Sequence, residues 1–318
     1  MTLLLILFSA SVLAGDWAAW RGPNHDGASE ETGLVSTWST EGENLLWRVD
    51  FVGRSTPVVL DGRVCVVGRV GEGVDKQEQV ACFDAQSGKL LWEHRLNVFL
   101  TSVPFPRVGW ASLAADLETG NIYFHGVGGL FICFDRNGKT LWERSLTEEF
   151  GRYSGYGGRT FTPVVDEDLV ILGIVTSSWG DLVVPRHRYF AFDKLTGQVA
   201  WVATPGGAPA DLNTYSTPVV AEIDGKRLLI AGNGDGGVYA MKVRTGEKVW
   251  GFNEIGELLL GKLSPEGYTD KGRVKVIEPV KISPNPRNGV NWAHPAFSGN
   301  KVYLRSDSRL VCLKIAGK

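Results

Sequence analysis

Residues 80–93 read VACFDAQSGKLLWE, and the same pattern returns three times further along the chain. The later copies are FICFDRNGKTLWE at 131–143, YFAFDKLTGQVAW at 189–201 and VYAMKVRTGEKVW at 238–250. In each copy an apolar stretch leads into a polar turn that contains glycine, and a second short stretch ends in tryptophan. Glycine adopts the positive φ angles that tight turns need. Each copy therefore predicts a β-hairpin.

A second pair of predicted strands precedes the hairpins, and the first strand of the pair opens with a small hydroxyl residue and proline. In the first unit these strands are 55–60 and 63–67, joined by a turn at Asp61-Gly62. Two later units open at 161–165 and 216–220. Because the hairpin supplies two more strands, one unit is predicted to contain four antiparallel strands.

The tryptophans that end the hairpins lie at 92, 142, 201 and 250, so they are 50, 59 and 49 residues apart. Four-stranded units of about 40–50 residues are typical of propeller blades. A single sheet of this size cannot bury both of its faces, and radial stacking on neighbouring sheets solves that problem. The chain is therefore predicted to be all-β, a β-propeller of four-stranded antiparallel blades with about five to six blade-like units.

The repeated residues have a structural interpretation. A large flat indole on the outer strand can cover the backbone of the adjoining blade where glycine leaves room. An aspartate in the turn can cap the backbone with its carboxylate. The residues assigned to these structural roles are Asp84, Gly88, Trp92, Asp135, Gly138, Trp142, Asp193, Gly197, Trp201, Gly246 and Trp250.

The core Asp-x-x-x-Gly-Lys-x-x-Trp, present as Asp84, Gly88, Lys89 and Trp92, resembles the PQQ-like β-propeller repeat family. The resemblance covers most of residues 44–315. That family includes quinoprotein dehydrogenases and non-enzymatic scaffolds similar to the outer-membrane assembly protein BamB. Its propellers commonly have about seven or eight blades. The resemblance therefore implies an incomplete ring in which about two or three blades are missing near 252–255.

Length and charge limit the classes of partner. The chain has 318 residues, of which 43% are hydrophobic, so it can bury a large core. Its 33 basic and 35 acidic residues leave a net charge of −2. Because no basic field attracts nucleic acid or an anionic membrane, neither is an expected partner.

The N-terminus reads as a targeting segment followed by a loop. Residues 1–15 form an apolar run that is too short to span a bilayer and ends in small residues, as a secretory signal peptide does. Asp16 stands where a bacterial lipoprotein has its lipidated cysteine. A periplasmic or secreted location without a lipid anchor is therefore predicted. Residues 16–43 are predicted to form a loop packed on the propeller, which takes up residues 44–318.

The four cysteines divide into two groups. Cys82, Cys133 and Cys312 occupy the same register in three blades and are expected to pack between sheets. Cys65 and Cys82 lie on neighbouring predicted strands, in register across a symmetric loop. Two interpretations stay open for this pair, a cross-strand disulfide in an oxidising compartment or two free thiols. No Cys-x-x-Cys pattern or histidine spacing suits zinc, so no metal site is predicted.

Two stretches depart from the repeat. Residues 45–51 resemble the last strand of a blade, and residues 292–315 resemble the first three strands of one. Their pairing is expected, because it would close the ring and remove free sheet edges. Residues 257–268 and 273–278 resemble the third and fourth strands of a blade whose first two strands are absent. An internal deletion, a faulty gene assembly or a smaller evolved ring would each explain this, and the orphan hairpin is expected to pack irregularly.

One face of the predicted propeller carries the candidate binding residues. The loop before each innermost strand and the loop between the second and third strands open on this face, which we call the funnel face. Arginine pairs with planar anions and stacks on rings, so a rim of arginine and aromatic residues suits carboxylates, sugars or peptides. Alternatively, these side chains bind strand carbonyls in a narrow channel. The candidates are Arg54, Trp110, Arg159, Trp179, Arg186, His187, Tyr215, Trp292 and His294.

Catalytic motifs are missing from the sequence. It has no Ser-His-Asp order, phosphate loop or dinucleotide fingerprint. It also lacks the adjacent cysteine pair that the resemblance to quinoprotein dehydrogenases implies. The sequence therefore favours a non-catalytic binding scaffold without a cofactor, similar to BamB-like assembly proteins. The alternatives are a quinoprotein dehydrogenase-like enzyme, for which the resemblance implies pyrroloquinoline quinone with calcium, and an envelope carbohydrate-binding module.

The expected partners are envelope proteins or a small ligand. A partner protein would bind across the funnel face or add an extended strand to an exposed sheet edge. The mature chain is predicted to be a monomer with no integral membrane segment.

Overall fold

The computed structural model describes residues 15–29, 45–98, 103–152, 160–177, 185–206, 216–223, 225–252, 257–264, 267–277, 296–298, 301–305 and 310–314. Within these ranges the chain is almost entirely antiparallel sheet. Its helical elements there are α1 (Leu146–Phe150) and two 3-10 turns at Gly73–Asp75 and Phe105–Arg107. The predicted all-β class is confirmed.

The first three sheets have four antiparallel strands each, in chain order, as the predicted blades do. The first sheet contains β1 (Val58–Leu60), β2 (Arg63–Val70), β3 (Gln77–Asp84) and β4 (Leu90–Asn97). The second contains β5 (Ala114–Ala115), β6 (Ile122–His125), β7 (Leu130–Phe134) and β8 (Thr140–Ser145). The third contains β9 (Val164–Asp166), β10 (Leu169–Thr176), β11 (Arg186–Asp193) and β12 (Val199–Ala203).

The fourth sheet has six strands and corrects one expectation. It contains β13 (Val219–Ile223), β14 (Lys226–Gly232), β15 (Val238–Lys242), β16 (Lys248–Phe252), β17 (Glu257–Ser264) and β18 (Gly267–Lys275). Within the stretches 257–268 and 273–278, predicted as half of a further blade, β17 and β18 instead form a hairpin that extends this sheet, with a register shift between Leu260 and Gly261. β17 pairs with β16 along its outer edge, with Gly251 opposite Leu259. Four residues separate the two strands, a connection of hairpin length that favours pairing with the strand just completed.

The fifth sheet contains β19 (Ala296–Ser298), β20 (Lys301–Arg305) and β21 (Leu310–Lys314) in that order. The expected pairing of residues 45–51 with this sheet is not formed among the residues that the structure describes. The N-terminal stretch lies on the first sheet instead. Trp47 Nε1 donates to the Ala85 carbonyl at 2.9 Å, and Gly53 forms a bridge to Gly68. These two contacts anchor the stretch beside β2 and β3.

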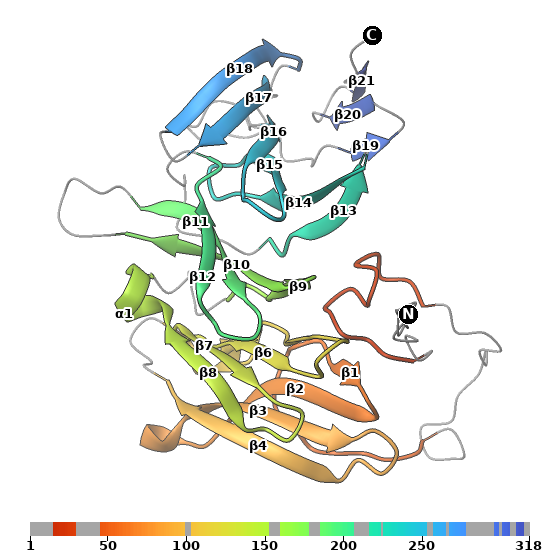
Figure 1. Ribbon diagram of the computed structural model, residues 1–318. Coiled ribbons are helices and arrows are strands. Elements are labelled where there is room, and N and C mark those ends of the chain that lie inside the picture. The colour runs from red at the N-terminus through yellow and green to blue at the C-terminus, as the bar shows by residue number, and fades with distance from the viewer. Residues whose placement is uncertain are drawn as a thin grey trace, which may run out of the picture.

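The sheets follow one another along an arc, from β1–β4 to β13–β18 (Figure 1). Their first strands are innermost, since β1 contacts β5 and β5 contacts β9. Residues 15–29 lie on the concave side. There Trp17 and Val59 exchange two backbone hydrogen bonds of 2.8 and 3.0 Å, and the Ala115 N–H donates to the Ala18 carbonyl at 2.8 Å. The N-terminal segment thereby joins the innermost strands of the first two sheets.

Tryptophan joins the first four sheets to one another, and Trp47 of the N-terminal stretch makes the same contact with the first sheet. Its indole lies on the hairpin glycine of the following sheet, where an added Cβ would lie 2.6–2.8 Å from the nearest ring carbons. The indole N–H also donates to a carbonyl of the same turn, at 2.9–3.1 Å. The pairs are Trp47 on Gly88, Trp92 on Gly138, Trp142 on Gly197 and Trp201 on Gly246. The side chain of Trp250 lies outside the described part of the chain.

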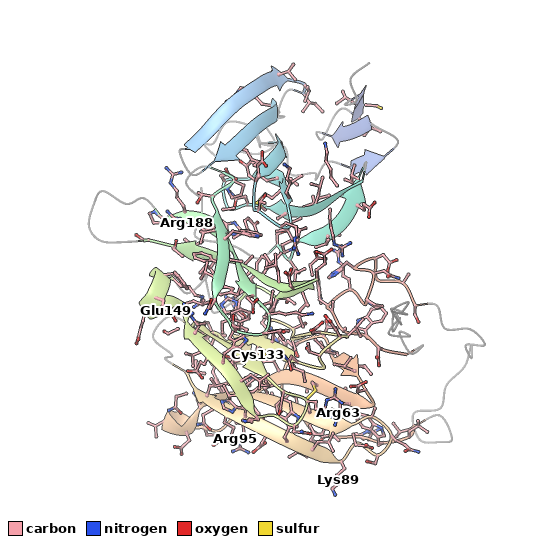
Figure 2. The ribbon with its side chains drawn as sticks, viewed as in Figure 1. Arg63, Lys89, Arg95, Cys133, Glu149 and Arg188 are labelled. Carbon is pink, nitrogen blue, oxygen red and sulfur yellow. A yellow bond between two sulfur atoms is a disulfide. The ribbon has the colours of Figure 1, made fainter. Side chains whose placement is uncertain are left out.

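The core lies between the sheets and is rich in aromatic rings (Figure 2). Phe131 of the second sheet meets Phe192 of the third edge to face, with ring centroids 5.3 Å apart. Both rings are fully buried. Edge-to-face pairs add about 0.5–1.5 kcal/mol to the stabilisation that burial provides.

The cysteines resolve the alternatives left open by the sequence. Cys65 and Cys82 lie directly opposite each other on β2 and β3 and form a disulfide. Cys133 is a buried free thiol. Cys312, which was expected to pack between sheets, is exposed. It belongs to the last strand of the three-stranded sheet, where no fourth strand covers it among the described residues.

Candidate functional site

The hydroxyl residues that open the innermost strands link the first three sheets by hydrogen bonds. The Thr56 N–H donates to Ser112 Oγ at 2.9 Å, and the Ser112 N–H donates to Thr162 Oγ1 at 3.1 Å. Each hydroxyl thus holds the backbone of the preceding sheet. The serine before Thr56 acts within its own sheet, since Ser55 Oγ accepts from the Val67 N–H at 2.8 Å.

A cavity of about 140 Å³ opens at this end of the innermost strands. Arg54 and Trp110, both predicted for the funnel face, come together there. The guanidinium carbon of Arg54 lies 5.4 Å from the centroid of the Trp110 ring. Trp20 enters the cavity from the N-terminal segment. The residues that line it are Trp20, Arg54, Thr56, Trp110, Ala111, Ser112, Thr160, Thr162 and Thr217.

The lining favours a ligand with acceptor oxygens. Among the described lining residues Arg54 is the one with a charge, and no described carboxylate forms an ion pair with its guanidinium. Thr160 is 7% exposed, and within the described ranges its Oγ1 has no hydrogen-bond partner. The indoles of Trp20 and Trp110 are 39% and 37% exposed. A guanidinium stacked on an indole beside the Thr160 hydroxyl is suited to a carboxylate, which accepts charge-assisted hydrogen bonds.

Of the other predicted funnel residues, the structure describes Arg186 and His187, and neither lines this cavity. Arg186 is half-buried at the start of β11, opposite Thr176. His187 is fully buried next to it. The remaining predictions, Arg159, Trp179, Tyr215, Trp292 and His294, lie outside the described residues.

His187 links the third sheet to the fourth rather than facing a ligand. Its Nδ1 accepts from the Gly234 N–H at 3.1 Å. Burial lowers the pKa of His187 to about 3, so the ring is neutral at physiological pH and its proton lies on Nε2. A buried neutral imidazole with this bond is a structural element of the blade interface.

Glu78 has the same role two interfaces earlier, between the first and second sheets. It stands six residues before the turn aspartate Asp84, as His187 stands six before Asp193. Its carboxylate accepts from the Val127 N–H at 2.8 Å. Sequence reasoning missed Glu78 and assigned His187 to the funnel face, although their equal distance from the turn aspartate is a signal that the repeat contains.

The Glu78 carboxylate also positions the candidate site. It accepts from the backbone N–H of Gly109, the residue before Trp110. Burial raises the pKa of Glu78 to about 7, while the two N–H donors and Arg152 act in the opposite direction. Arg152 is itself buried, which lowers its pKa to about 10, and it donates to the Val127 carbonyl at 3.2 Å.

A larger cavity, of about 340 Å³, lies at the other end of the innermost strands, under the N-terminal segment. Its charged groups are already paired. Arg227 Nε lies 2.9 Å from both carboxylate oxygens of Asp166. His25, from the N-terminal segment, is half-buried, and burial lowers its pKa. This cavity is close to neutral and offers no unpaired charge among its described lining residues.

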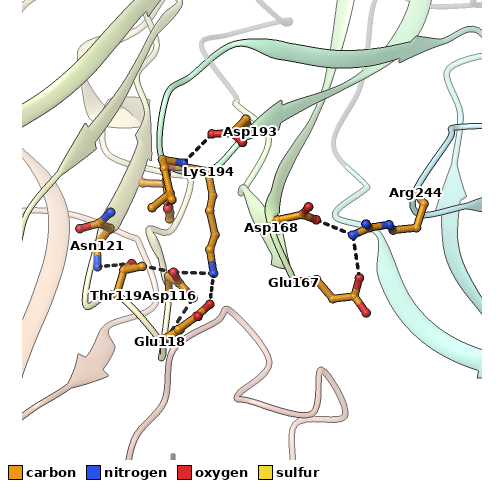
Figure 3. A network of polar contacts seen from close by, with 11 residues as sticks. Asp116, Glu118, Thr119, Asn121, Glu167, Asp168, Asp193, Lys194 and Arg244 are labelled. Carbon is orange, nitrogen blue, oxygen red and sulfur yellow. Dashed lines mark hydrogen bonds and ion pairs between the residues drawn. The ribbon is translucent and has the colours of Figure 1, made fainter. Parts of the chain in front are cut away.

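Ion pairs join successive sheets at this end (Figure 3). In each pair a basic residue of one hairpin turn meets an acidic residue from the first turn of the preceding sheet. Lys194 Nζ lies 2.9 Å from Asp116 and 2.7 Å from Glu118. The equivalent pairs are Arg136 with Asp61 at 3.7 Å, and Arg244 with Glu167 at 3.0 Å and Asp168 at 2.6 Å.

The cavity of about 140 Å³ beside Arg54 and Trp110, which we call the funnel cavity, does not fit a quinone held beside calcium. Calcium takes six to eight oxygen ligands, mainly carboxylate and carbonyl groups. The cavity lining includes no carboxylate, and no cluster of three or more histidine, cysteine, aspartate or glutamate residues suited to a metal occurs within the described ranges. The adjacent cysteines expected of such an enzyme are absent from the sequence.

Within the described part of the chain, no helix is long and apolar enough to span a membrane.

The stacked four-stranded sheets, joined by tryptophan on glycine, define a repeat β-propeller. A family profile described as outer membrane protein assembly factor BamB matches residues 27–174 and, in a second register, residues 76–253. The chain therefore belongs to the BamB-like family of PQQ-repeat β-propellers.

Solved structures similar to the chain include quinohemoprotein alcohol dehydrogenases and BamB. A quinohemoprotein alcohol dehydrogenase from Comamonas testosteroni is 15% identical over 80% of this chain and 51% of that chain, with a TM-score of 0.48. One from Pseudomonas putida HK5 is 14% identical over 81% and 51%, with a TM-score of 0.45. BamB from Moraxella catarrhalis is 16% identical over 84% of each chain, with a TM-score of 0.35. The chain thus spans about half the length of the two dehydrogenases. No curated protein matches it.

Proposed function

We propose that this protein is a non-catalytic scaffold that binds a partner protein through the funnel cavity. The observation that carries the proposal is the Arg54 guanidinium, stacked on Trp110 in a cavity whose described lining residues include several hydroxyl groups and no carboxylate. Membership of the BamB-like family supports a scaffold, and the lining residues offer neither a nucleophile activated by a base nor a metal-binding cluster.

The cavity's size supports an inserted side chain over a whole cofactor. Small-molecule sites usually enclose about 300–1,000 Å³, whereas this cavity has about 140 Å³. An aspartate or glutamate side chain, or a C-terminal carboxylate, would place acceptor oxygens near Arg54 and Thr160. The ligand class proposed for the funnel cavity is therefore the carboxylate of a partner protein.

An oxidising compartment is part of the proposal. The Cys65–Cys82 disulfide is a feature of secreted and periplasmic proteins and is rare in the cytosol. Together with the apolar run at 1–15, it supports a periplasmic or secreted location.

The test uses a fluorescein-labelled tetrapeptide that ends in glutamate with a free C-terminus. Fluorescence anisotropy is expected to show binding that weakens with salt and falls at least about tenfold in Arg54→Gln, because a charge-assisted bond is lost. Arg136→Gln, an arginine at the other end of the strands, is the matched control and should bind like the unaltered protein.

The neutral counterpart of the peptide, with glutamine and a C-terminal amide, should not bind. Equal binding of the two peptides, or equal binding by Arg54→Gln, would refute the carboxylate site. Binding of a neutral oligosaccharide, with no binding of the acidic peptide, would favour a carbohydrate-binding module. The exposed indoles of Trp20 and Trp110 would then stack on sugar rings.

A further inference from the structure

The outer strands of the first three sheets are edge strands. β4, β8 and β12 each end their sheet, and among the described residues no further strand pairs with them. An unpaired edge presents a row of backbone N–H and C=O groups to any extended chain that reaches it. Proteins suppress such pairing with charged side chains on the edge. The charges on these three strands therefore show which edges are protected.

The residue after the hairpin tryptophan separates protected edges from unprotected ones. It is Glu93 in β4 and Glu143 in β8, and both side chains are exposed. At the same position β12 has Val202, whose side chain is 47% exposed. Further charges flank the glutamates: Arg95 pairs with Glu93 at 2.8 Å, and Arg144 follows Glu143.

The whole of β12 is uncharged. It reads Val-Ala-Trp-Val-Ala, and Val199, Ala200 and Val202 are exposed. Figure 1 shows β12 along the outside of the third sheet. The pairing of β12 with β11 contains a register shift, and so does the pairing of β16 with β15, where β16 still accepts β17. An apolar edge without charge or proline is the kind that accepts an added strand.

The fourth sheet shows what such an edge does in this fold. Its outer strand, β16, also lacks the glutamate and has Gly251 at that position. The chain covers this edge itself, because β17 pairs with β16 over Trp250, Gly251 and Phe252. The covering segment has three consecutive leucines at 258–260. Of the outer strands of the four tryptophan repeats, β16 and β12 lack the glutamate, and within the described residues only β16 is covered.

We propose that the free edge of β12 binds an extended apolar segment of a partner protein by strand addition. The proposal rests on the proposed function, a scaffold that binds proteins, and adds a second contact surface to the funnel cavity. The segment would supply about five residues without proline, with leucine or β-branched side chains beside Val202. Backbone hydrogen bonds to β12 would provide affinity. Because β12 carries no charge, the partner segment would pair with it rather than with β4 or β8.

The probe is a labelled peptide that copies residues 257–264, ELLLGKLS, the segment with which the chain covers its own β16. We expect anisotropy to show binding, and hydrogen exchange to show new protection at residues 199–203. Val202→Glu restores the glutamate of the first two sheets and should reduce affinity at least about tenfold. This variant is expected to fold, because glutamate already stands at this position in β4 and β8.

The reciprocal variant, Glu143→Val, is the matched control. It removes the glutamate from β8 and should create a second protected segment at residues 140–145. A peptide with proline in place of the central leucine should not bind, because proline lacks the N–H that strand pairing uses.

The proposal would be overturned if Val202→Glu bound the peptide as tightly as the unaltered protein, or if no protection appeared at 199–203. It would also be overturned if light scattering showed a dimer with these residues already protected, since the occupant would then be a second copy. Arg54→Gln separates this surface from the funnel cavity, because it should weaken the acidic peptide and leave the leucine peptide unaffected. If only one of the two peptides fails to bind the unaltered protein, that result identifies which proposal fails.

Discussion

At the scale of single residues, the turn glycines serve two purposes at once. Gly197 has a φ of +69°, which L side chains rarely adopt. It also lies under the indole of Trp142, where an added Cβ would lie 2.7 Å from a ring carbon. Backbone conformation alone would permit asparagine at some cost, but the indole contact leaves no room for any side chain.

The two contributions can be separated by substitution. Gly62 has a φ of +70° with nothing within 4 Å of an added Cβ, so it reports backbone strain alone. Gly62→Ala is expected to cost about 1 kcal/mol, and Gly197→Ala about 1–3 kcal/mol more, because the Trp142 indole must move. Urea unfolding of both variants measures the difference. Equal losses of unfolding free energy in the two variants would mean that the contact of the Trp142 indole does not require glycine at position 197.

Glu78 connects a single carboxyl group to the stability of the whole chain. Burial raises its pKa from 4.5 to about 7 in the folded state, so the folded protein holds this proton more tightly than the unfolded one. The contribution of Glu78 to the free energy of unfolding is complete below about pH 4.5 and is lost as pH rises through about 7. The unfolding free energy should fall by up to about 3 kcal/mol across this window.

Glu78→Gln is expected to remove this fall. The half-buried His25 and the buried His125 and His187, whose pKa values are lowered, act in the opposite sense below about pH 6.5. The measurement is therefore the difference in unfolding free energy between the variant and the unaltered protein, followed from pH 5 to 8. The exposed Glu143→Gln should leave the profile unchanged, and a parallel profile for Glu78→Gln would contradict the assignment.

At the scale of elements, equivalent turns use one ion-pair pattern at different degrees of burial. Lys194 and Asp116 have side chains that are 5% and 7% exposed, whereas Arg136 and Asp61 are 51% and 42% exposed. Hydrogen bonds and charge from Glu118 and Asp116 outweigh burial and raise the pKa of Lys194. The same geometry therefore has different energetic consequences at the two interfaces.

Removing the base at each interface should expose this contrast. Lys194→Met leaves the buried Asp116 charge without its partner and is expected to cost about 3–5 kcal/mol. Arg136→Met breaks an exposed pair and should cost about 1 kcal/mol or less. Chemical denaturation of both variants provides the comparison. Similar losses in the two variants would show that burial does not control the strength of these pairs.

At the scale of the whole molecule, periodicity predicted far more of the fold than of the site. The repeat identified the four hairpins, the strands before them and the indole that covers a turn glycine, because these contacts recur at one spacing. It did not predict where β17 and β18 would pair, because the sequence of an apolar hairpin does not specify which sheet it joins. The same limit applies to Trp47, whose segment was expected beside the C-terminal sheet.

The candidate site was only partly predictable for a related reason. Arg54 and Trp110 lie in equivalent loops, so the repeat placed them on one face. Trp20 reached the cavity through the backbone pairing of Trp17 with Val59, which no local pattern indicates. His187 belonged to the predicted rim by position, but its side chain turns into the interface between sheets because it can bond the Gly234 N–H there.

The contact of tryptophan with glycine also gives each sheet a direction. One side of a sheet presents the indole and the other presents the glycine turn, so neighbouring sheets associate head to tail. Head-to-tail association has no built-in stopping point, and it ends only when geometry closes a ring or another element blocks the last side. Whole units can therefore be duplicated or deleted within the gene without creating a mismatched junction. In such a lineage the number of blades can change in single steps while each remaining interface keeps its chemistry.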